Sequence, residues 1–311
     1  MMNASAAPLP PLQLAAYVAP GLLERQGIFL AASLRAFGQH LAGLPLRFYC
    51  PCPPADFAPQ ALRIFQDCGV TLCPLSIPTA LLEFPYAAKV FAAAQAEADV
   101  LQAADPPTLV WLDPDTFFQK APLAFALPPS AALAYRPVMH NVIGPLYGQP
   151  LDAFWETIFS ACGVPHQRLF PMQTVIDQVQ LYPYFNDGLL VLRPQLGLLH
   201  AWLQEFTRLY QHPDLLPLYA HKRLYAIFVH QAVLAGVLLA RLAPEQMLLL
   251  PPDHNYPLNL YARDQTPNRP ARLEPLTTFR FEDVFENPAW EEGFPAGAEL
   301  RAWIRQWIFW H

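Results

Sequence analysis

Strand-like and helix-like patterns alternate through the first 112 residues, and this alternation is compatible with only a few classes of fold. Short apolar runs that end at proline or in a turn are typical of strands, whereas wider apolar spacing is typical of helices. The expected elements alternate: strands at 12–19, 44–51, 70–75 and 108–112, with helices between them at 23–41, 58–69 and 85–104. Strands joined by helices of this length form a parallel sheet that is covered on both faces. The sequence therefore predicts an α/β fold with a mainly parallel central sheet flanked by helices.

The second half of the chain is less regular but shows no convincing domain boundary. Residues 251–288 are rich in proline and asparagine and are expected to be loop. The other expected elements are strands at 130–138, 184–194 and 246–252, and helices at 150–163, 195–210, 222–240 and 298–311. We therefore expect one domain that spans residues 1–311.

Composition limits the partners of this chain. Hydrophobic residues make up 54% of the 311 residues and charged residues only 14%, which is typical of a packed globular protein. The net charge of −6 offers no general attraction for nucleic acid or for an anionic membrane. Five cysteines without a regular framework suggest free thiols in a reducing compartment. Because no basic residue precedes Arg25 and no apolar run reaches the ~18 residues of a spanning helix, we expect a soluble cytoplasmic protein without a transmembrane segment.

Two aspartates follow the fourth expected strand, in "TLVWLDPDTFF" at 108–118. In an extended segment, residues two apart point to the same side, so Asp113 and Asp115 can share a ligand. Two adjacent carboxylates repel unless a cation lies between them, and oxygen ligands suit Mg²⁺ or Mn²⁺, which can bridge to a diphosphate. The alternative is that both aspartates only cap the following turn.

The order of several short motifs resembles the glycogenin-like retaining glycosyltransferases, which have the GT-A fold. That family has a lysine-bearing helix, then "LDxD", "FNxG" before an apolar strand, "DQxxLN" and "LPxxYN". The matching segments here are "YAAKVF" with Lys89, "LDPDT" with Asp113 and Asp115, "YFNDGLLVLRP" with Asn186 and Gly188, "HQAVL" with Gln231, and "LPPDHNYPLN" with Asn255. The resemblance implies a Rossmann-like GT-A sandwich with a nucleotide-binding half (12–116), a sugar and acceptor half (117–260) and a C-terminal loop and helix (261–311).

The resemblance also implies a function and roles for residues. The chain would transfer a sugar from a nucleotide-diphosphate donor, with a UDP-sugar favoured, to the hydroxyl of an unknown acceptor. Asp113 and Asp115 would hold Mn²⁺ or Mg²⁺ against the diphosphate, which stabilises the leaving group. The other donor-binding residues implied are Tyr17 at the base, Lys89 at the phosphates, Asn186 at sugar hydroxyls, and Gly188, which lets the backbone approach the donor. Gln231 matches a residue that lies near the reacting carbon in that family.

Three departures from the family pattern stand out. Asp187 occupies a position where the family usually has a small residue, so it could act as a general base or bind the donor sugar. His230 replaces the aspartate of "DQ" and could contact the donor, although a lone histidine on an apolar helix is more often a core residue. The family's late "HxxGxxKPW" segment, which supplies a third metal ligand, is absent, and the nearest stretch is "FRFEDVFENPAW" at 279–290. His254 or Glu282 could supply that third ligand.

Two other classes of function compete with sugar transfer. A non-catalytic protein that binds nucleotide sugars or glycans on the same fold is suggested by the missing late segment. A phosphohydrolase of the haloacid dehalogenase type also carries Asp-x-Asp at a strand end. That family has the motif on its first strand with a threonine two residues later, whereas Thr116 follows Asp115 directly. Sugar transfer is therefore the favoured function.

Overall fold

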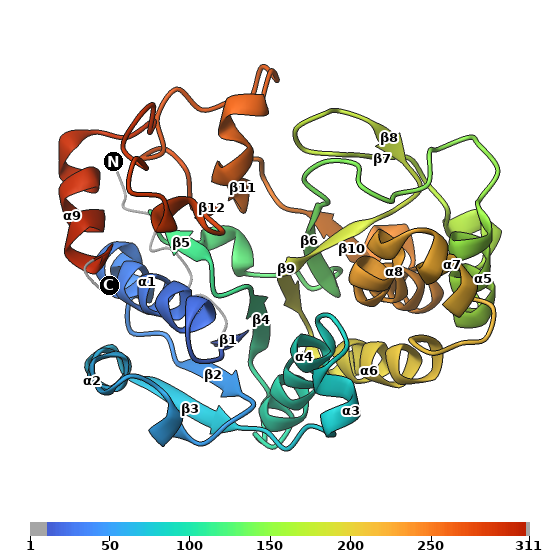
Figure 1. The fold of residues 1–311 in the computed structure, drawn as a ribbon, viewed down its shortest axis with the longest axis horizontal. Helices are drawn as coiled ribbons and strands as arrows, with labels where there is room; N and C mark the ends of the chain where they lie inside the picture. Colours follow the sequence, from blue (N-terminus) through green and yellow to red (C-terminus); the bar gives the residue numbers. More distant parts are fainter. Residues whose placement is uncertain (1–10, 309–311) are drawn as a thin grey trace.

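The structure is a computed structural model that describes residues 11–308, and residues 1–10 and 309–311 lie outside that range. A sheet of seven strands in the order β10-β6-β9-β4-β1-β2-β3 forms the centre of the molecule (Figure 1). Its strands are β1 (Leu12–Tyr17), β2 (Leu46–Cys50), β3 (Val70–Pro74), β4 (Thr108–Leu112), β6 (Leu133–Pro137), β9 (Phe185–Leu192) and β10 (Met247–Leu249). Neighbouring strands are parallel except at β9, which is antiparallel to both β4 and β6. The predicted α/β class with a mainly parallel sheet is confirmed.

Helices cover both faces of this sheet because the strands are apolar on both sides. Along β1, Leu14 and Ala16 belong to one core and Ala15 to the other, as expected when successive side chains point to opposite faces. The first core includes α1 (Leu22–Phe37) and α2 (Pro59–Asp67), and the second includes α4 (Ala87–Val100), α5 (Ala153–Cys162), α6 (Leu198–Leu209) and α8 (Arg223–Arg241). Two short helices were not predicted, α3 (Thr79–Leu82) and α7 (Leu216–His221).

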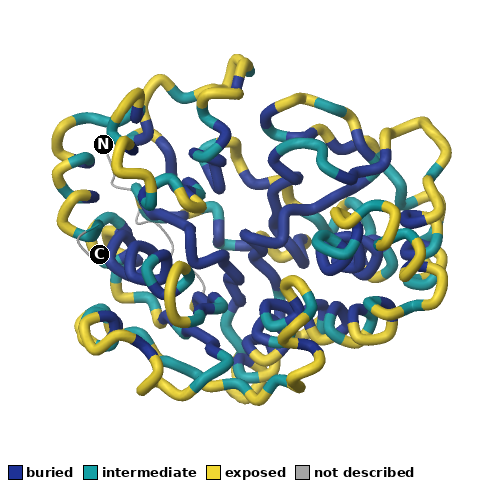
Figure 2. The backbone as a smooth tube through the Cα atoms, in the orientation of Figure 1, coloured by how far each residue is buried: buried dark blue, intermediate teal, exposed yellow. Residues whose placement is uncertain are grey.

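The most buried elements lie in the middle of the molecule (Figure 2). Every residue of β4 and β9 is buried, which explains why both read as continuous apolar runs in the sequence. Among the described residues, α8 is the one helix long and apolar enough to cross a membrane by length and composition, and 61% of its apolar window is buried inside the protein. It packs against α5, α6 and α7, so it serves as a core helix in this fold.

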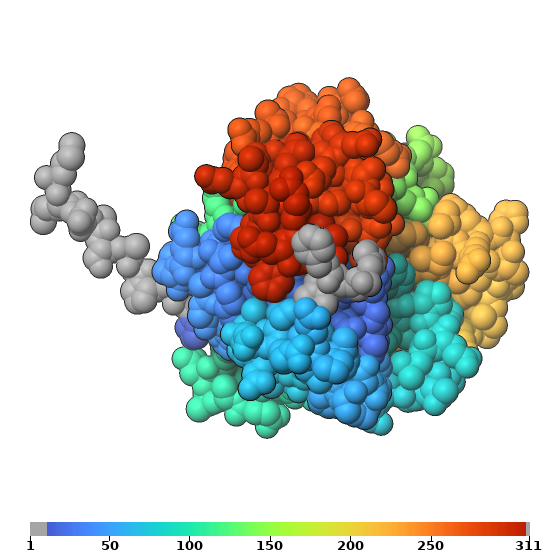
Figure 3. Space-filling view, turned by 60° about the vertical axis from the view of Figure 1, so that its left-hand side comes forward, coloured from blue at the N-terminus to red at the C-terminus, as the bar shows by residue number. Residues whose placement is uncertain are grey.

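The C-terminal part forms a third packing layer around a small sheet of three strands. This sheet has the order β11-β12-β5, made of β5 (Thr116–Phe118), β11 (Tyr256–Pro257) and β12 (Thr278–Arg280). The rings of Phe117 and Phe279 stack at 4.7 Å, and α9 (Ala298–Ile308) packs on the same core. Figure 3 shows the C-terminal segment lying over the N-terminal part of the chain. The remaining strands, β7 (Met172–Gln173) and β8 (Gln180–Leu181), form a separate hairpin.

Residues 251–288 differ in part from the loop that the sequence predicted. They are mostly irregular, but they contain β11 and β12. Strands of two and three residues are too short to show an apolar period, so only their pairing with other segments reveals them. The expected helix at 298–311 is present as α9 up to Ile308, and its last three residues lie outside the described range.

Candidate active site

The reversed direction of β9 brings two of the predicted motifs together. Since β9 runs antiparallel to β4, its beginning lies at the sheet edge where β4 ends, with Leu189 opposite Leu112. The backbone N–H of Asp113 donates to the carbonyl of Gly188 at 2.8 Å. The Asp-x-Asp and "YFNDG" motifs, more than seventy residues apart in the chain, are therefore neighbours.

A cavity of about 890 Å³ opens at this edge of the sheet and gathers most of the predicted site residues. It also contacts the beginning of α1 and α4 and the middle of α8. The predicted residues that line it are Tyr17, Lys89, Asp113, Asp115, Asn186, Asp187, His230, Gln231 and Glu282. The position and volume of the cavity fit a ligand-binding site of an α/β sheet.

Lys89 links two of the acids from the first turn of α4. Its Nζ lies 2.6 Å from Asp113 Oδ1 and 2.8 Å from Asp187 Oδ2, and all three side chains are at most 13% exposed. Burial alone lowers the pKa of the ammonium, but the two carboxylates outweigh it, so the pKa is raised and Lys89 stays charged. This lysine is therefore part of a buried ionic cluster and is not a solvated helix residue.

Arg280, from β12, holds both aspartates of the Asp-x-Asp motif. Its Nη2 lies 3.0 Å from Asp113 Oδ2 and 3.1 Å from Asp115 Oδ2, and its Nε lies 3.2 Å from both oxygens of Asp115. Burial lowers the pKa of the guanidinium. The carboxylates of Asp115 and Asp113 raise it by more than burial lowers it, so the pKa lies above its ordinary value. The antiparallel pairing of β12 with β5 places Arg280 opposite Thr116, directly after Asp115.

Asp187 and His230, two departures from the family pattern, contact each other. The Nε2 of His230 lies 3.0 Å from Asp187 Oδ2, and its Nδ1 lies 2.9 Å from the carbonyl oxygen of Ile227. Tyr86 stacks on the imidazole at 4.5 Å. Although burial raises the pKa of Asp187, Lys89 and His230 together hold it well below its usual range. A carboxylate with so low a pKa is a weak base at neutral pH, which favours the other predicted role of Asp187, donor binding.

Three amides and a glycine lie beside the ionic cluster, and two of the amides, those of Asn186 and Gln231, line the cavity. Asn186 Oδ1 accepts hydrogen bonds from the N–H of Gly188 at 2.9 Å and from Asn255 Nδ2 at 3.1 Å. Gln231 is fixed on α8 by donating to the carbonyl of Phe185 at 2.8 Å. A Cβ at Gly188 would lie 2.5 Å from Asp113 Oδ2, so a larger residue fits here only if Asp113 moves. The amides are thus held in position before any ligand binds.

The donor set does not fit a resident Mn²⁺ or Mg²⁺. The oxygens of Asp113 and Asp115 already face the nitrogens of Lys89 and Arg280. Within residues 11–308, no three histidine, cysteine, aspartate or glutamate side chains are arranged to hold a metal ion. A divalent ion could bind the two aspartates only by displacing the guanidinium.

The two candidates for a third metal ligand lie in different surroundings. The Nδ1 of His254 lies 2.9 Å from Asp253 Oδ1, its ring packs 5.8 Å from that of Phe125, and it does not line the cavity. This geometry does not support His254 as a metal ligand, because the turn before β11 buries its ring against Phe125. Glu282 does line the cavity, where its backbone N–H donates to Asp115 Oδ2 at 3.2 Å and burial raises the pKa of its carboxyl group.

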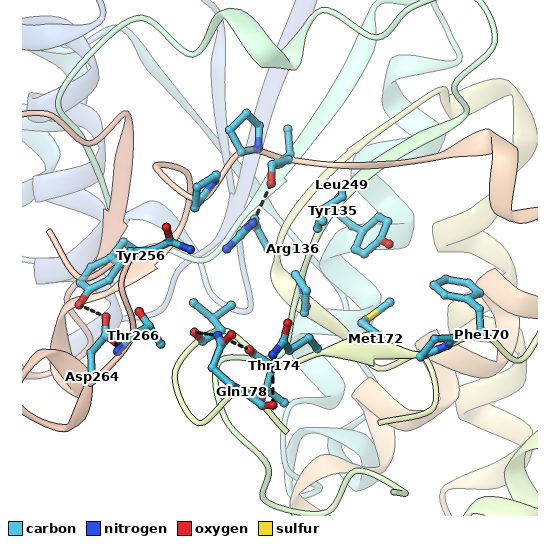
Figure 4. Close-up of a pocket in the computed structure, with 18 residues that line it drawn as sticks. Tyr135, Arg136, Phe170, Met172, Thr174, Gln178, Leu249, Tyr256, Asp264 and Thr266 are labelled. Carbon is cyan, nitrogen blue, oxygen red and sulfur yellow. Dashed lines mark hydrogen bonds between the residues drawn. The ribbon is translucent and has the colours of Figure 1, made fainter. Parts of the chain in front are cut away.

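A second cavity, of about 450 Å³, lies at the end of β6, and none of the predicted site residues lines it (Figure 4). Arg136 is its buried cation, 7% exposed, and donates from Nη1 to the carbonyl of Leu250 at 2.7 Å. Pro137 belongs to this second cavity and Val138 to the first, so the two cavities meet at consecutive residues of the chain.

Sequence reasoning missed two residues of the site, Arg280 and Tyr86. Arg280 lies within the stretch 279–290 that was compared with the absent late segment, but nothing local marked it as a partner of Asp115. Tyr86 precedes α4 and has a left-handed backbone, with φ of 59°. A positive φ at a bulky residue signals a constrained position, but it is visible only in the structure.

Comparison with known proteins agrees with the class that the fold and site define, a glycosyltransferase of the GT-A fold. Residues 14–235 match the family described as Rhodobacterales glycosyltransferase domain, and the chain belongs to this family. It is accordingly an enzyme of sugar transfer, while the narrower glycogenin-like placement stays a prediction. A search of curated proteins found no match.

Solved glycosyltransferases share the fold at low sequence identity. The apo form of GlyE from Streptococcus pneumoniae TIGR4 is 17% identical, with a TM-score of 0.50 over 96% of this chain and 60% of that one. The galactosyltransferase LgtC in complex with donor and acceptor sugar analogues is 12% identical, with a TM-score of 0.47 over 86% of each chain. Core-mannan synthase A from Aspergillus fumigatus, solved in its Mn/GDP form, is 10% identical, with a TM-score of 0.44 over 80% of this chain and 74% of that one.

Proposed function

We propose that this glycosyltransferase moves a sugar from a nucleoside-diphosphate donor to an acceptor hydroxyl in the large cavity at the ends of β1 and β4. The observation that carries the proposal is the buried cluster of Lys89 and Arg280 with Asp113, Asp115 and Asp187 in that cavity. Fixed cations at the carboxyl edge of an α/β sheet suit the diphosphate of such a donor. A UDP-sugar is favoured by the resemblance, and the cytoplasmic location stays a prediction.

The reaction exchanges one bond for another at the anomeric carbon of the sugar. The bond from this carbon to the diphosphate oxygen breaks, and its electron pair stays on the diphosphate. The acceptor oxygen forms the new bond and loses its proton, so the products are the glycoside, the nucleoside diphosphate and a proton. Negative charge grows on the leaving diphosphate, and positive charge held beside it lowers the barrier.

The other residues of the cavity would bind and orient the donor. Tyr17, which lines the cavity at the end of β1, would stack on the base or hydrogen-bond to it. Asn186 and Gln231 present amides next to the ionic cluster, where sugar hydroxyls would lie. Asp187 would bind the donor sugar in its ionised form. No step here depends on the Mn²⁺ or Mg²⁺ that the sequence predicted at Asp113 and Asp115, because Lys89 and Arg280 face the oxygens of these aspartates.

The test is release of nucleoside diphosphate from a panel of UDP- and GDP-sugars, with simple glycosides as acceptors, followed by chromatography. We expect release with one donor, and a loss of at least tenfold in Gln231→Ala. The control is Gln195→Ala, because Gln195 is exposed and lies outside the cavity. Binding of a nucleotide sugar without any release would favour the non-catalytic binder. Release of inorganic phosphate from phosphomonoesters, with no effect of nucleotide sugars, would favour the phosphohydrolase.

A further inference from the structure

Arg280 lies where a cation bound to the Asp-x-Asp motif would be. Its guanidinium is within 3.2 Å of oxygens on both Asp113 and Asp115. The side chains of the three residues are only 15%, 13% and 4% exposed, respectively. A planar guanidinium that contacts two buried carboxylates is a strong, oriented interaction and is costly to break.

The backbone around Arg280 holds it there. β12 pairs with β5, so Arg280 is in register with the residue that follows Asp115. The stacked rings of Phe117 and Phe279, in the packing layer around the three-stranded sheet, stabilise this pairing. Asp115 also accepts the backbone N–H of Glu282, which ties the end of β12 to the same carboxylate. The contact is thus built into the fold by strand pairing.

The charges of the cluster support the same conclusion. Lys89 and Arg280 together carry two positive charges, as many as one divalent ion would supply, beside the three carboxylates of Asp113, Asp115 and Asp187. A metal ion between the aspartates would have to displace the guanidinium and leave it beside a second cation, which like-charge repulsion opposes. Arg280 lines the cavity, and its Nε and Nη2 bond to the aspartates. Its Nη1 makes no hydrogen bond to any of residues 11–308.

We propose that Arg280, together with Lys89, replaces the divalent cation of this site, so that the diphosphate is bound and its developing charge stabilised by fixed side chains without a metal ion. This inference rests on the proposed function, because the diphosphate belongs to the nucleotide donor. The unbonded Nη1 group would donate to a phosphate oxygen, while Nε and Nη2 stay on the aspartates. The aspartates then serve to position Arg280.

The first experiment measures binding of UDP and GDP by calorimetry, on protein freed of metal with EDTA and again with added Mn²⁺. We expect wild type to bind one of them in EDTA, with an affinity that Mn²⁺ changes less than threefold. Arg280→Ala should bind at least tenfold more weakly in EDTA, and Arg280→Lys should recover only part of the loss because lysine lacks the planar fork. The control is Arg272→Ala, since Arg272 is 62% exposed and pairs with Glu274 on the surface. Nucleotide binding by wild type that vanishes in EDTA and returns with Mn²⁺ would overturn the inference.

A second experiment follows Mn²⁺ directly by electron paramagnetic resonance without nucleotide. Wild type should bind no Mn²⁺ at this site, whereas Arg280→Ala should gain a site, because Asp115 and Oδ2 of Asp113 lose their guanidinium partner. Wild-type binding of one Mn²⁺ that Asp113→Asn removes would also overturn the inference. If neither nucleotide binds under any condition, the proposed donor is wrong, and the resonance experiment still decides whether Arg280 excludes the ion.

Discussion

Replacing Gly188 with alanine tests how closely the start of β9 packs against the ionic cluster. A Cβ at this position would lie 2.5 Å from Asp113 Oδ2, and 3.0 Å from both Arg280 Nη1 and Asn186 Oδ1. Side chains do not persist at 2.5 Å from a carboxylate oxygen, so Asp113 must move. Because its carboxylate is held by Lys89 and Arg280, the movement strains two buried ionic contacts.

The expected loss of stability in Gly188→Ala follows from two opposing effects. Overpacking a buried site lowers the free energy of unfolding by about 1–3 kcal/mol. Alanine in place of glycine raises it by up to about 1 kcal/mol, because it restricts the unfolded chain. The free energy of unfolding should therefore fall by about 1–2 kcal/mol. Binding of the donor nucleotide should weaken about tenfold, which corresponds to about 1.4 kcal/mol, because Asp113 and Arg280 line the donor cavity.

Urea unfolding and calorimetry measure the two losses. The control is Gly43→Ala, because a Cβ on this exposed turn residue would meet no atom within 4 Å. It should stay within about 0.5 kcal/mol of wild type in stability and bind nucleotide normally. If Gly188→Ala unfolds at the same urea concentration as Gly43→Ala and binds equally well, the proposed crowding at β9 is refuted.

Three further substitutions test other parts of the structure by urea unfolding. Asp152→Ala removes the side chain that accepts the N–H of Trp155 at the start of α5, and should cost about 1–2 kcal/mol; no loss would contradict the cap. Trp303→Ala removes the ring that packs 5.3 Å from Phe117, and should cost about 3 kcal/mol; a change below about 0.5 kcal/mol would mean that α9 is not docked there. Burial lowers the pKa of His254 below its ordinary value, so the unfolded chain binds more protons as the pH falls below about 6.5. Stability should decline in that range, and less steeply in His254→Gln; equal slopes would show that His254 is not responsible.

Much of the fold could be predicted because the buried strands and long helices carry local patterns. β4 and β9 are apolar on both faces, and α1, α4 and α8 have helical spacing or strong helix formers. The two motifs at the sheet edge were also visible, since polar residues next to a buried strand have few structural reasons to be there. The short helices α3 and α7 were missed because four to six residues do not show a period.

The partners of those motifs could not be predicted from local sequence. The resemblance placed Lys89 at the phosphates of the donor, but only the structure shows its partners, Asp113 and Asp187. His254 follows Asp253 in a turn whose direction no local pattern reveals, and it points into the core.

The sequence by itself determined the alternation of strands and helices, the class of fold and the placement of the Asp-x-Asp motif at a strand end. Only the tertiary structure decided what those acids bind. Arg280 lies 165 residues after Asp115, in a proline-rich stretch that reads as loop. It reaches the carboxylate because the three-residue strand β12 pairs with β5. Local sequence patterns indicate which backbone conformation a segment prefers and which of its side chains are buried. An ion pair between distant segments depends instead on the tertiary contacts that bring those segments together.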